Sequence, residues 1–332
     1  MRKLTVSAAI IGALLLLGHL SGSQPERDSV AAASAELGIA FESRRIETGE
    51  VRLHVVFVGP EQGPPVVLLH GFPEFWYAWR GPAAVLARAG FRVIVPDQRG
   101  YNLSDKPAGA EAYRLGKLAA DVVGLIDALG YDRVALGAQD VGARVAWHLV
   151  LTEPERVSRF AVIDVGHPLG YEEAVSAEET VSWYRTFLQI PWLPGYTARL
   201  GNWWLLSSNL RATSADGAFP DAELDYFRSA WDRDGAIHSM GAWYRAPVDP
   251  LDAEPRVTTP TQLILAAEDA FIPTDLTRAG MKYLDRGELV ELGSGTHWVA
   301  GEEPERIGEL LARFFAVQTV QTAETVQDAD GI

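Results

Sequence analysis

One acidic residue stands at the centre of a segment whose spacing suits covalent chemistry. Residues 137–143 read GAQDVGA and follow a predicted buried strand. A strand that turns sharply into a helix lifts its central side chain above the sheet edge, provided that small residues stand two positions before and after it. Ala138 and Gly142 meet this need around Asp140. A carboxylate attacks a saturated carbon without help from a base, so we predict that Asp140 is a nucleophile. The alternative is a helix N-cap.

A second candidate segment is the loop at residues 70–73 (HGFP), directly after an apolar run at 66–69. In sites of this kind, a backbone N–H from such a loop pairs with the N–H that follows the nucleophile. We therefore predict that the backbone N–H groups of Phe72 and Val141 form an oxyanion hole. The alternative is a plain Gly-Pro turn. In either case we expect His70 to fix the loop rather than to transfer protons.

A base and two candidate acids follow later in the chain. His297 comes a few residues after the last predicted strand, where a loop returns toward the nucleophile. Asp269 lies just past a buried strand, and the order nucleophile, acid, base is typical of hydrolytic triads on parallel sheets. Asp164 also ends a predicted strand and is the alternative acid. Its other interpretation is a hydrogen-bonded residue that supports a hinge.

The elements that must position these residues alternate along the chain. Apolar runs predict strands at residues 51–58, 66–70, 91–96, 133–137, 160–163, 262–267 and 288–292. Helical spacing predicts helices at 83–88 and 117–129, and another from the nucleophile segment through Trp147. This alternation indicates an α/β fold, with a mostly parallel sheet covered by helices on both faces. Each candidate residue then lies at the carboxyl end of a different strand.

The alternation breaks between residues 166 and 255. This interval reads as mainly helical, and it carries an unusual set of aromatic residues: Trp183, Tyr184, Phe187, Trp192, Trp203, Trp204, Trp231, Trp243 and Tyr244. We predict that it is a cap over a pocket, inserted between two parts of a hydrolase core at 37–165 and 256–317. The alternative is a second packed lobe without a site.

The two ends of the chain differ from the body. Arg2 and Lys3 precede an apolar run at 4–17, and small residues follow at 21–23. This layout predicts a signal peptide at 1–23, because the apolar run is short for a spanning helix. We expect the body to be exported to the periplasm or secreted, with an uncleaved N-terminal anchor as the alternative. Residues 24–36 read as a linker and residues 318–332 as a mobile tail.

Composition excludes several function classes. The 332 residues include 29 Lys and Arg against 44 Asp and Glu, which gives a formal net charge of −15 and disfavours nucleic acid as a partner. The chain has no cysteine, which removes disulfides, thiolate nucleophiles and cysteine-based zinc sites. We find no motif for a metal or an organic cofactor and predict neither. A homodimer is compatible with the sequence.

Two segments carry a resemblance to a known family. Residues 70–80 (HGFPEFWYAWR) and 97–107 (DQRGYNLSDKP) resemble the α/β-hydrolase-fold epoxide hydrolases, and the similarity runs from about residue 45 to 316. The resemblance implies a small apolar substrate, an epoxide, that is opened to a diol. It also implies two cap tyrosines that hold the epoxide oxygen. They fall on Tyr184 and Tyr244.

The family pattern assigns the remaining roles to residues already singled out. It implies that Asp140 forms an alkyl ester with the substrate, and that His297, oriented by Asp269, activates the water that hydrolyses this ester. No metal or organic cofactor takes part. Asn102 stands where the family often has Gly, which is a loop variation without an evident reason in the sequence.

The chain departs from the family at the nucleophile, where QDV replaces the usual HDW. This departure bears on the alternative enzyme class, the dehalogenases. Haloalkane dehalogenases hold halide with a Trp after the nucleophile, and haloacetate dehalogenases place an Arg there and take their acid at the position of Asp164. Val141 supplies neither side chain. A third hypothesis is a non-catalytic binding protein on a hydrolase scaffold, against which the complete set of Asp140, Asp269 and His297 speaks.

Overall fold

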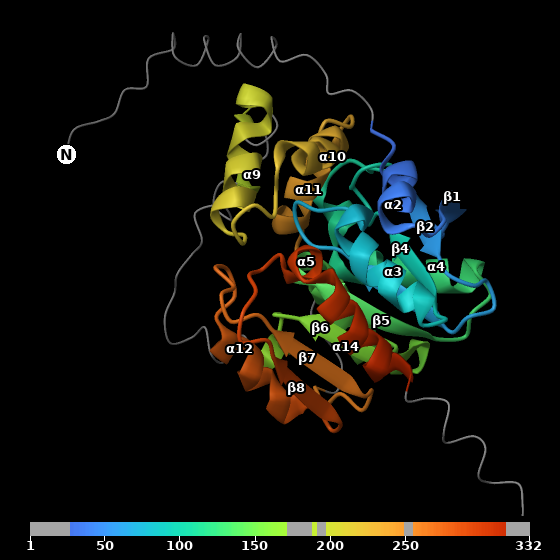
Figure 1. Cartoon of the computed structure of the whole chain (residues 1–332). Coiled ribbons are helices and arrows are strands. Elements are labelled where there is room, and N and C mark those ends of the chain that lie inside the picture. Colours follow the sequence, from blue (N-terminus) through green and yellow to red (C-terminus); the bar gives the residue numbers. More distant parts are fainter. Residues whose placement is uncertain (1–26, 171–187, 191–196, 249–254, 317–332) are drawn as a thin grey trace, which may run out of the picture.

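The structure is a computed structural model, and it describes residues 27–170, 188–190, 197–248 and 255–316. Within these ranges the strands form one sheet with the order β1-β2-β4-β3-β5-β6-β7-β8 (Figure 1). β2 runs antiparallel to β1 and β4, and all other neighbours are parallel. The strands are β1 (Phe41–Glu47), β2 (Arg52–Val58), β3 (Pro65–Leu69), β4 (Arg92–Pro96), β5 (Val134–Gln139), β6 (Val157–Ile163), β7 (Thr261–Leu265) and β8 (Gly287–Glu291).

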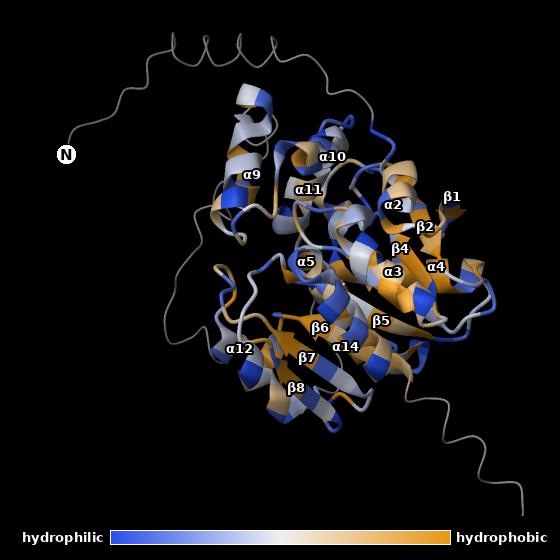
Figure 2. Ribbon diagram, in the orientation of Figure 1, coloured by the Kyte–Doolittle hydropathy of each residue, from blue (hydrophilic) through white to orange (hydrophobic). Residues whose placement is uncertain are grey.

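The central strands are buried along their length. Every residue of β4, β5 and β7 is buried, and Figure 2 colours most of the central sheet as hydrophobic. A strand that is apolar on both sides needs cover on both faces of its sheet. Two helix pairs supply it, since α3 (Arg80–Arg88) packs against α14 (Pro304–Ala316) and α4 (Leu115–Ala128) packs against α5 (Asp140–Thr152). The predicted α/β architecture is therefore confirmed.

Shorter elements complete the core. Helices α12 (Thr274–Ala279) and α13 (Val299–Glu302) follow β7 and β8, and 3-10 turns occur at Trp76–Trp79, Ala110–Tyr113, Pro154–Arg156 and Gly280–Tyr283. The strands predicted after residue 50 are present within a few residues of their expected bounds. The sequence pattern does not predict β1, because only its first and sixth residues are apolar. Its charged, exposed side chains suit an edge strand, where they oppose pairing with another chain.

Helix α2 (Ser29–Leu37) replaces most of the segment that the sequence analysis interprets as a linker at 24–36. The Asp28 side chain caps it by accepting hydrogen bonds from the N–H groups of Val30 and Ala31, and Gly38 ends it with φ 63°. Alanine has the highest helix propensity of all residues, so the Ala-rich composition favours a helix once these caps are present. The linker interpretation fails because it weighs polarity above the capping residues.

The segment between β6 and β7 contains helices α9 (Leu200–Ala212), α10 (Asp221–Trp231) and α11 (Ala236–Arg245). Figure 1 shows them together on one side of the sheet. Two indole N–H groups attach them to loops after parallel strands: Trp231 donates to the carbonyl of Pro73 at 2.6 Å, and Trp243 donates to that of Arg99 at 2.9 Å. The inserted helices therefore lie at the carboxyl edge of the sheet, where the candidate residues are expected.

Several predictions concern parts of the chain outside the described residues. They are the signal peptide at 1–23, the tail at 318–332 and the cap tyrosine Tyr184. In the ranges that the structure describes, no helix combines the length and the apolar content that crossing a membrane requires.

Candidate active site

Asp140 occupies a sharp turn between β5 and α5. It is the first residue of α5, with φ at 48°, in the left-handed region that non-glycine residues rarely adopt. The turn approaches the loop after β3 so closely that a Cβ at Gly142 would lie 2.5 Å from the carbonyl oxygen of His70. Small residues are therefore required there, as the sequence predicts. The Asp140 side chain stands at the helix N-terminus, where a negative charge is stabilised.

The loop after β3 supplies a backbone donor to this carboxylate. The N–H of Phe72 donates to Oδ2 of Asp140 at 2.8 Å. A Cβ at Gly71 would lie 2.9 Å from Cβ of Asp140, so only glycine permits this approach. The predicted donor residue Phe72 is thus aimed at the predicted nucleophile.

His70 holds the loop in place through both ring nitrogens. Nδ1 lies 2.9 Å from the carbonyl oxygen of Gly71, and Nε2 accepts a hydrogen bond from the N–H of Gln98 at 3.1 Å. Since Nε2 is the acceptor, Nδ1 carries the proton and donates to Gly71. Burial lowers the pKa of His70, which keeps the ring neutral. The ring is fully engaged with the backbone, as the sequence analysis expects.

His297 and Asp269 form a buried pair. Nδ1 of His297 lies 2.7 Å from Oδ2 of Asp269, whose other oxygen accepts from the N–H groups of Phe271 and Ile272 at 2.6 and 2.9 Å. Burial by itself lowers the pKa of His297, but Asp269, and with smaller effect Asp140 and Asp164, raise it to about 9. Burial by itself raises the pKa of Asp269. His297 and the two N–H donors lower it by more, so the pKa of Asp269 lies below its usual value.

Asp164, the alternative acid, lies close to this pair. Its Oδ1 accepts from the N–H of Ala266 at 2.7 Å, and its backbone has φ at 60°. Burial, reinforced by the charge of Asp269, raises the pKa of Asp164 well above its usual range. Ligand atoms of Asp164, Asp269 and His297 all lie within 4.8 Å of one another, which is a spacing that could hold a cation. A cation there would compete with the hydrogen bond between His297 and Asp269.

Gln139 links the end of β5 to the loop that contains His297. Its Nε2 donates to the carbonyl oxygen of His297 at 2.5 Å, and its side chain is buried. In the sequence, Gln139 stands out only as a departure from the family pattern. Its contact could not be predicted, because the partner is 158 positions away in the chain.

Glu74 is a further acidic side chain at the site, and in the sequence it stands out only as part of the segment at residues 70–80. It is 5% exposed, and its Oε2 accepts from the N–H of Gly71 at 3.2 Å. Burial raises the pKa of Glu74 to about 7; His297 lowers it and Asp140 raises it. The carboxyl group therefore lies within electrostatic reach of both the candidate nucleophile and the candidate base.

Tyr244 is the candidate tyrosine that the structure describes. It lies in α11 and is half-buried, and its ring packs edge-on against that of Phe72 with centroids 5.3 Å apart. The N–H of the same Phe72 residue contacts Asp140. The inserted helices thus bring Tyr244 next to the loop after β3, which contacts Asp140. Its predicted partner Tyr184 lies outside the described residues.

Comparisons with known proteins agree with this geometry. Residues 64–304 match the family model of the alpha/beta hydrolase fold. The chain is 34% identical to the AB hydrolase superfamily protein YfhM of Bacillus subtilis, over 82% of this chain and 97% of that protein. It is 30% identical to epoxide hydrolase 4 of Mus musculus, over 83% of this chain and 79% of that protein.

A solved structure of an epoxide hydrolase matches the fold of this chain. The crystal structure of an epoxide hydrolase from Bacillus megaterium in complex with an inhibitor matches with a TM-score of 0.72 and 25% identity, over 82% of this chain and 99% of that one. The elbow at Asp140, the hydrogen-bonded His297 and Asp269, and the inserted helices are the features that such a fold carries. The chain therefore belongs to the α/β-hydrolase-fold family of epoxide hydrolases.

Proposed function

We propose that this protein is an epoxide hydrolase that opens an epoxide to a vicinal diol through an ester on Asp140. The observation that carries the proposal is the position of the Asp140 carboxylate. It stands on a strained turn, receives the N–H of Phe72 at 2.8 Å, and lies close enough to the buried His297–Asp269 pair to raise the pKa of the histidine. Two of the proteins named above, from Mus musculus and Bacillus megaterium, are epoxide hydrolases, which supports this substrate class.

The first step forms the ester. A carboxylate oxygen of Asp140 attacks one epoxide carbon, the bond from that carbon to the ring oxygen breaks, and the electron pair stays on the oxygen. This oxygen needs a hydrogen-bond donor as its charge develops, and a phenol serves that purpose. Tyr244 is placed next to the loop of Phe72 and takes this role. Tyr184 is the second donor that the family pattern implies.

The second step hydrolyses the ester. His297 accepts a proton from water, the hydroxide oxygen adds to the ester carbonyl, and the N–H groups of Phe72 and Val141 stabilise the resulting oxyanion. The oxyanion then collapses: the bond from the acyl carbon to the substrate oxygen breaks, that oxygen takes the proton from His297, the diol leaves, and the Asp140 carboxylate is restored. Asp269 orients the imidazole through Nδ1, which leaves Nε2 to take the proton. Alkylation removes the charge of Asp140, one of the causes that raise the pKa of His297, so the histidine becomes better able to release its proton and act as a base.

A dehalogenase uses the same nucleophile, and the site favours it less. Val141 is buried and follows the nucleophile without a donor group in its side chain. A halide leaves without needing a proton, so it makes no use of a phenol at the position of Tyr244. Release of chloride or bromide from a haloalkane or a haloacetate, at a rate above that of diol formation from epoxides, would favour the dehalogenase.

Single turnover in ¹⁸O-labelled water tests the covalent mechanism. With enzyme in excess over the epoxide, the oxygen that reaches the diol comes from the Asp140 carboxylate and is unlabelled. The label should then be found in the protein, in a peptide that contains Asp140. Label in the first-turnover diol would indicate direct attack by water and would refute the ester.

A further inference from the structure

The turn that carries the predicted oxyanion donor is closed by hydrogen bonds at its two ends. The N–H of Glu74 donates to the carbonyl of Gly71 at 3.1 Å, and the N–H of Gly71 donates to Oε2 of Glu74 at 3.2 Å. Nδ1 of His70 donates to the same Gly71 carbonyl at 2.9 Å. Phe72 and Pro73 form the corner of this turn. None of these three bonds reaches the corner, which contains the N–H that faces the candidate nucleophile.

The inserted helices hold this corner from the other side. Proline has no N–H, so the carbonyl is the only backbone group through which Pro73 can be hydrogen-bonded to its surroundings. That carbonyl accepts from Nε1 of Trp231 in α10 at 2.6 Å, and the bond is buried. The ring of Phe72 packs edge-on against that of Tyr244 in α11, with centroids 5.3 Å apart. Both corner residues therefore contact the inserted helices directly.

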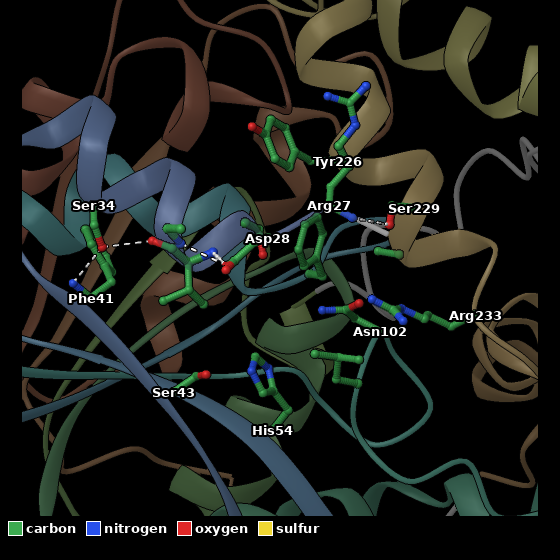
Figure 3. Close-up of a pocket in the computed structure, with 16 residues that line it drawn as sticks. Arg27, Asp28, Ser34, Phe41, Ser43, His54, Asn102, Tyr226, Ser229 and Arg233 are labelled. Atoms are coloured by element: carbon green, nitrogen blue, oxygen red, sulfur yellow. Dashed lines mark hydrogen bonds between the residues drawn. The ribbon is translucent and has the colours of Figure 1, made fainter. Parts of the chain in front are cut away.

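Helix α10 is itself fixed to the core at further points. The ring of Phe227 packs edge-on against that of Phe75, which directly follows the turn, with centroids 5.5 Å apart. The N–H of Arg27 donates to Oγ of Ser229 at 3.3 Å. Figure 3 shows this bond beside the cavity of about 540 Å³ that α2 and α10 both line. The indole that reaches the turn is thus mounted on a helix that is anchored independently of the turn's corner.

The direction of the Phe72 N–H matters differently in the two steps of the proposed mechanism. In the resting site it donates to Oδ2 of Asp140 at 2.8 Å. Attack on the epoxide moves negative charge away from this carboxylate and onto the substrate oxygen. Addition of water to the ester then places negative charge on the carbonyl oxygen that this N–H faces, and a correctly aimed donor stabilises it. Misdirection of the N–H should therefore slow hydrolysis of the ester more than its formation.

We propose that Trp231 is a positioning residue for the oxyanion hole and that it acts through the carbonyl of Pro73. Its indole N–H fixes the corner of the turn, so that the N–H of Phe72 stays directed at the oxygen of Asp140. The inference rests on the proposed ester mechanism. It gives the inserted helices a part in the hydrolysis step, in addition to the phenol that Tyr244 supplies to the ring-opening step.

Single-turnover kinetics of the full-length protein with an epoxide test the role of the indole N–H. Trp231→Phe removes this donor and keeps an aromatic ring. Hydrolysis of the adduct should slow by about tenfold, because misdirecting an oxyanion donor costs less than the hundredfold or more that follows from its removal. Formation of the adduct should stay near the parent rate. A second variant carries 3-benzothienylalanine at position 231, which keeps the bicyclic ring and replaces the N–H by sulfur; it should show the same split between the two steps.

The matched control is Trp203→Phe, which makes the same change of side chain in the same aromatic cluster. Trp203 is buried, and its ring lies 5.8 Å from that of Trp231 between centroids. Among the residues that the structure describes, it makes no hydrogen bond to the turn, so this variant should hydrolyse the adduct as the parent does. Equal slowing in Trp203→Phe, parent-like hydrolysis in both variants at position 231, or equal slowing of both steps would each overturn the proposal.

Amide hydrogen exchange, followed by mass spectrometry on peptides that contain Phe72, gives a readout that needs no adduct. In Trp231→Phe the Phe72 amide should exchange roughly tenfold faster than in the parent, the scale of one lost hydrogen bond, and in Trp203→Phe it should not. Unchanged exchange at Phe72 would overturn the positioning role even if the ester forms. Absence of an adduct from the parent and from all variants would refute the ester, while faster exchange in Trp231→Phe would still support the support of the turn by Trp231. Failure of the mechanism and failure of the positioning role are therefore distinguishable.

Discussion

The hydrogen bond from Gln139 to the backbone of His297 links the nucleophile strand to the base. Donor and acceptor are 2.5 Å apart, and both residues are buried. In Gln139→Met, the carbonyl of His297 loses this donor while the volume of the side chain is nearly kept. A buried acceptor left without a partner costs about 1–3 kcal/mol. If the loop of His297 shifts to regain a partner, ester hydrolysis should slow by roughly tenfold to a hundredfold.

The assay is a single turnover with an epoxide, in which intact mass follows the adduct on Asp140 and chromatography follows the diol. In the proposed mechanism, formation of the adduct depends on Asp140 and the tyrosine donors, so its rate should stay near that of the parent. Decay of the adduct depends, in the same proposal, on His297 and should become slow. The variant should therefore accumulate adduct that the parent does not.

Two controls distinguish this effect from a general loss of stability. Gln262→Met replaces another buried glutamine, in β7, whose Oε1 has no hydrogen-bond partner in the structure. It should leave adduct decay unchanged. Gln139→His again supplies a hydrogen-bond donor at this position, as a ring N–H, and should recover most of the hydrolysis rate. Equal decay in Gln139→Met and the parent, or equal slowing in Gln262→Met, would refute a positioning role for Gln139.

Three further predictions concern single side chains. Asp269→Asn should slow hydrolysis of the adduct by up to about 10⁴-fold, as for other triad acids. Asp164→Asn should slow it far less, because Asp164 bonds Ala266 and Asp269 bonds His297; the reverse ranking in the same assay would move the role of acid to Asp164. Tyr244→Phe should slow adduct formation by roughly 10²-fold in stopped-flow kinetics. An unchanged rate would reduce Tyr244 to a packing residue. Glu74→Gln should gain up to about 3 kcal/mol in free energy of unfolding relative to the parent between pH 4.5 and about 7, measured by urea titration. The sign follows from the raised pKa of Glu74: the unfolded chain loses this proton first, so the parent is destabilised as the pH rises through that window, and the variant is not. A difference that does not change with pH would contradict it.

The sequence predicts the parts of this site that depend on local pattern. The elbow around Asp140 needs small neighbours, and His297 and Asp269 follow apolar strands, so each could be placed at a strand end before the fold was known. The parts that could not be predicted depend on distant partners. Burial of Glu74 depends on the packing of the loop after β3 in the folded chain, and the contact of Gln139 requires the loop of His297.

The choice between the two acids shows the same limit. Asp164 and Asp269 both end strands, and strands β6 and β7 are neighbours in the sheet. Proximity alone therefore cannot separate them. Their surroundings differ in the structure: two backbone N–H groups and His297 favour the ionised form of Asp269, whereas burial beside that charge favours the neutral form of Asp164. We therefore expect Asp269 to be the acid.

Four carboxyl groups thus surround one histidine, and their charges depend on one another. Asp140 raises the pKa of both Glu74 and His297. Conversion of Asp140 to an ester removes this charge and should lower both pKa values together. Glu74 then ionises more readily, and His297 releases its proton more readily. In the proposed mechanism, the covalent step therefore moves the site from a state in which the histidine holds a proton, and stabilises the attacking carboxylate, to one in which it can accept a proton from water. Formation of the ester and activation of the base are then coupled, in this proposal, through the charge of a single residue, Asp140.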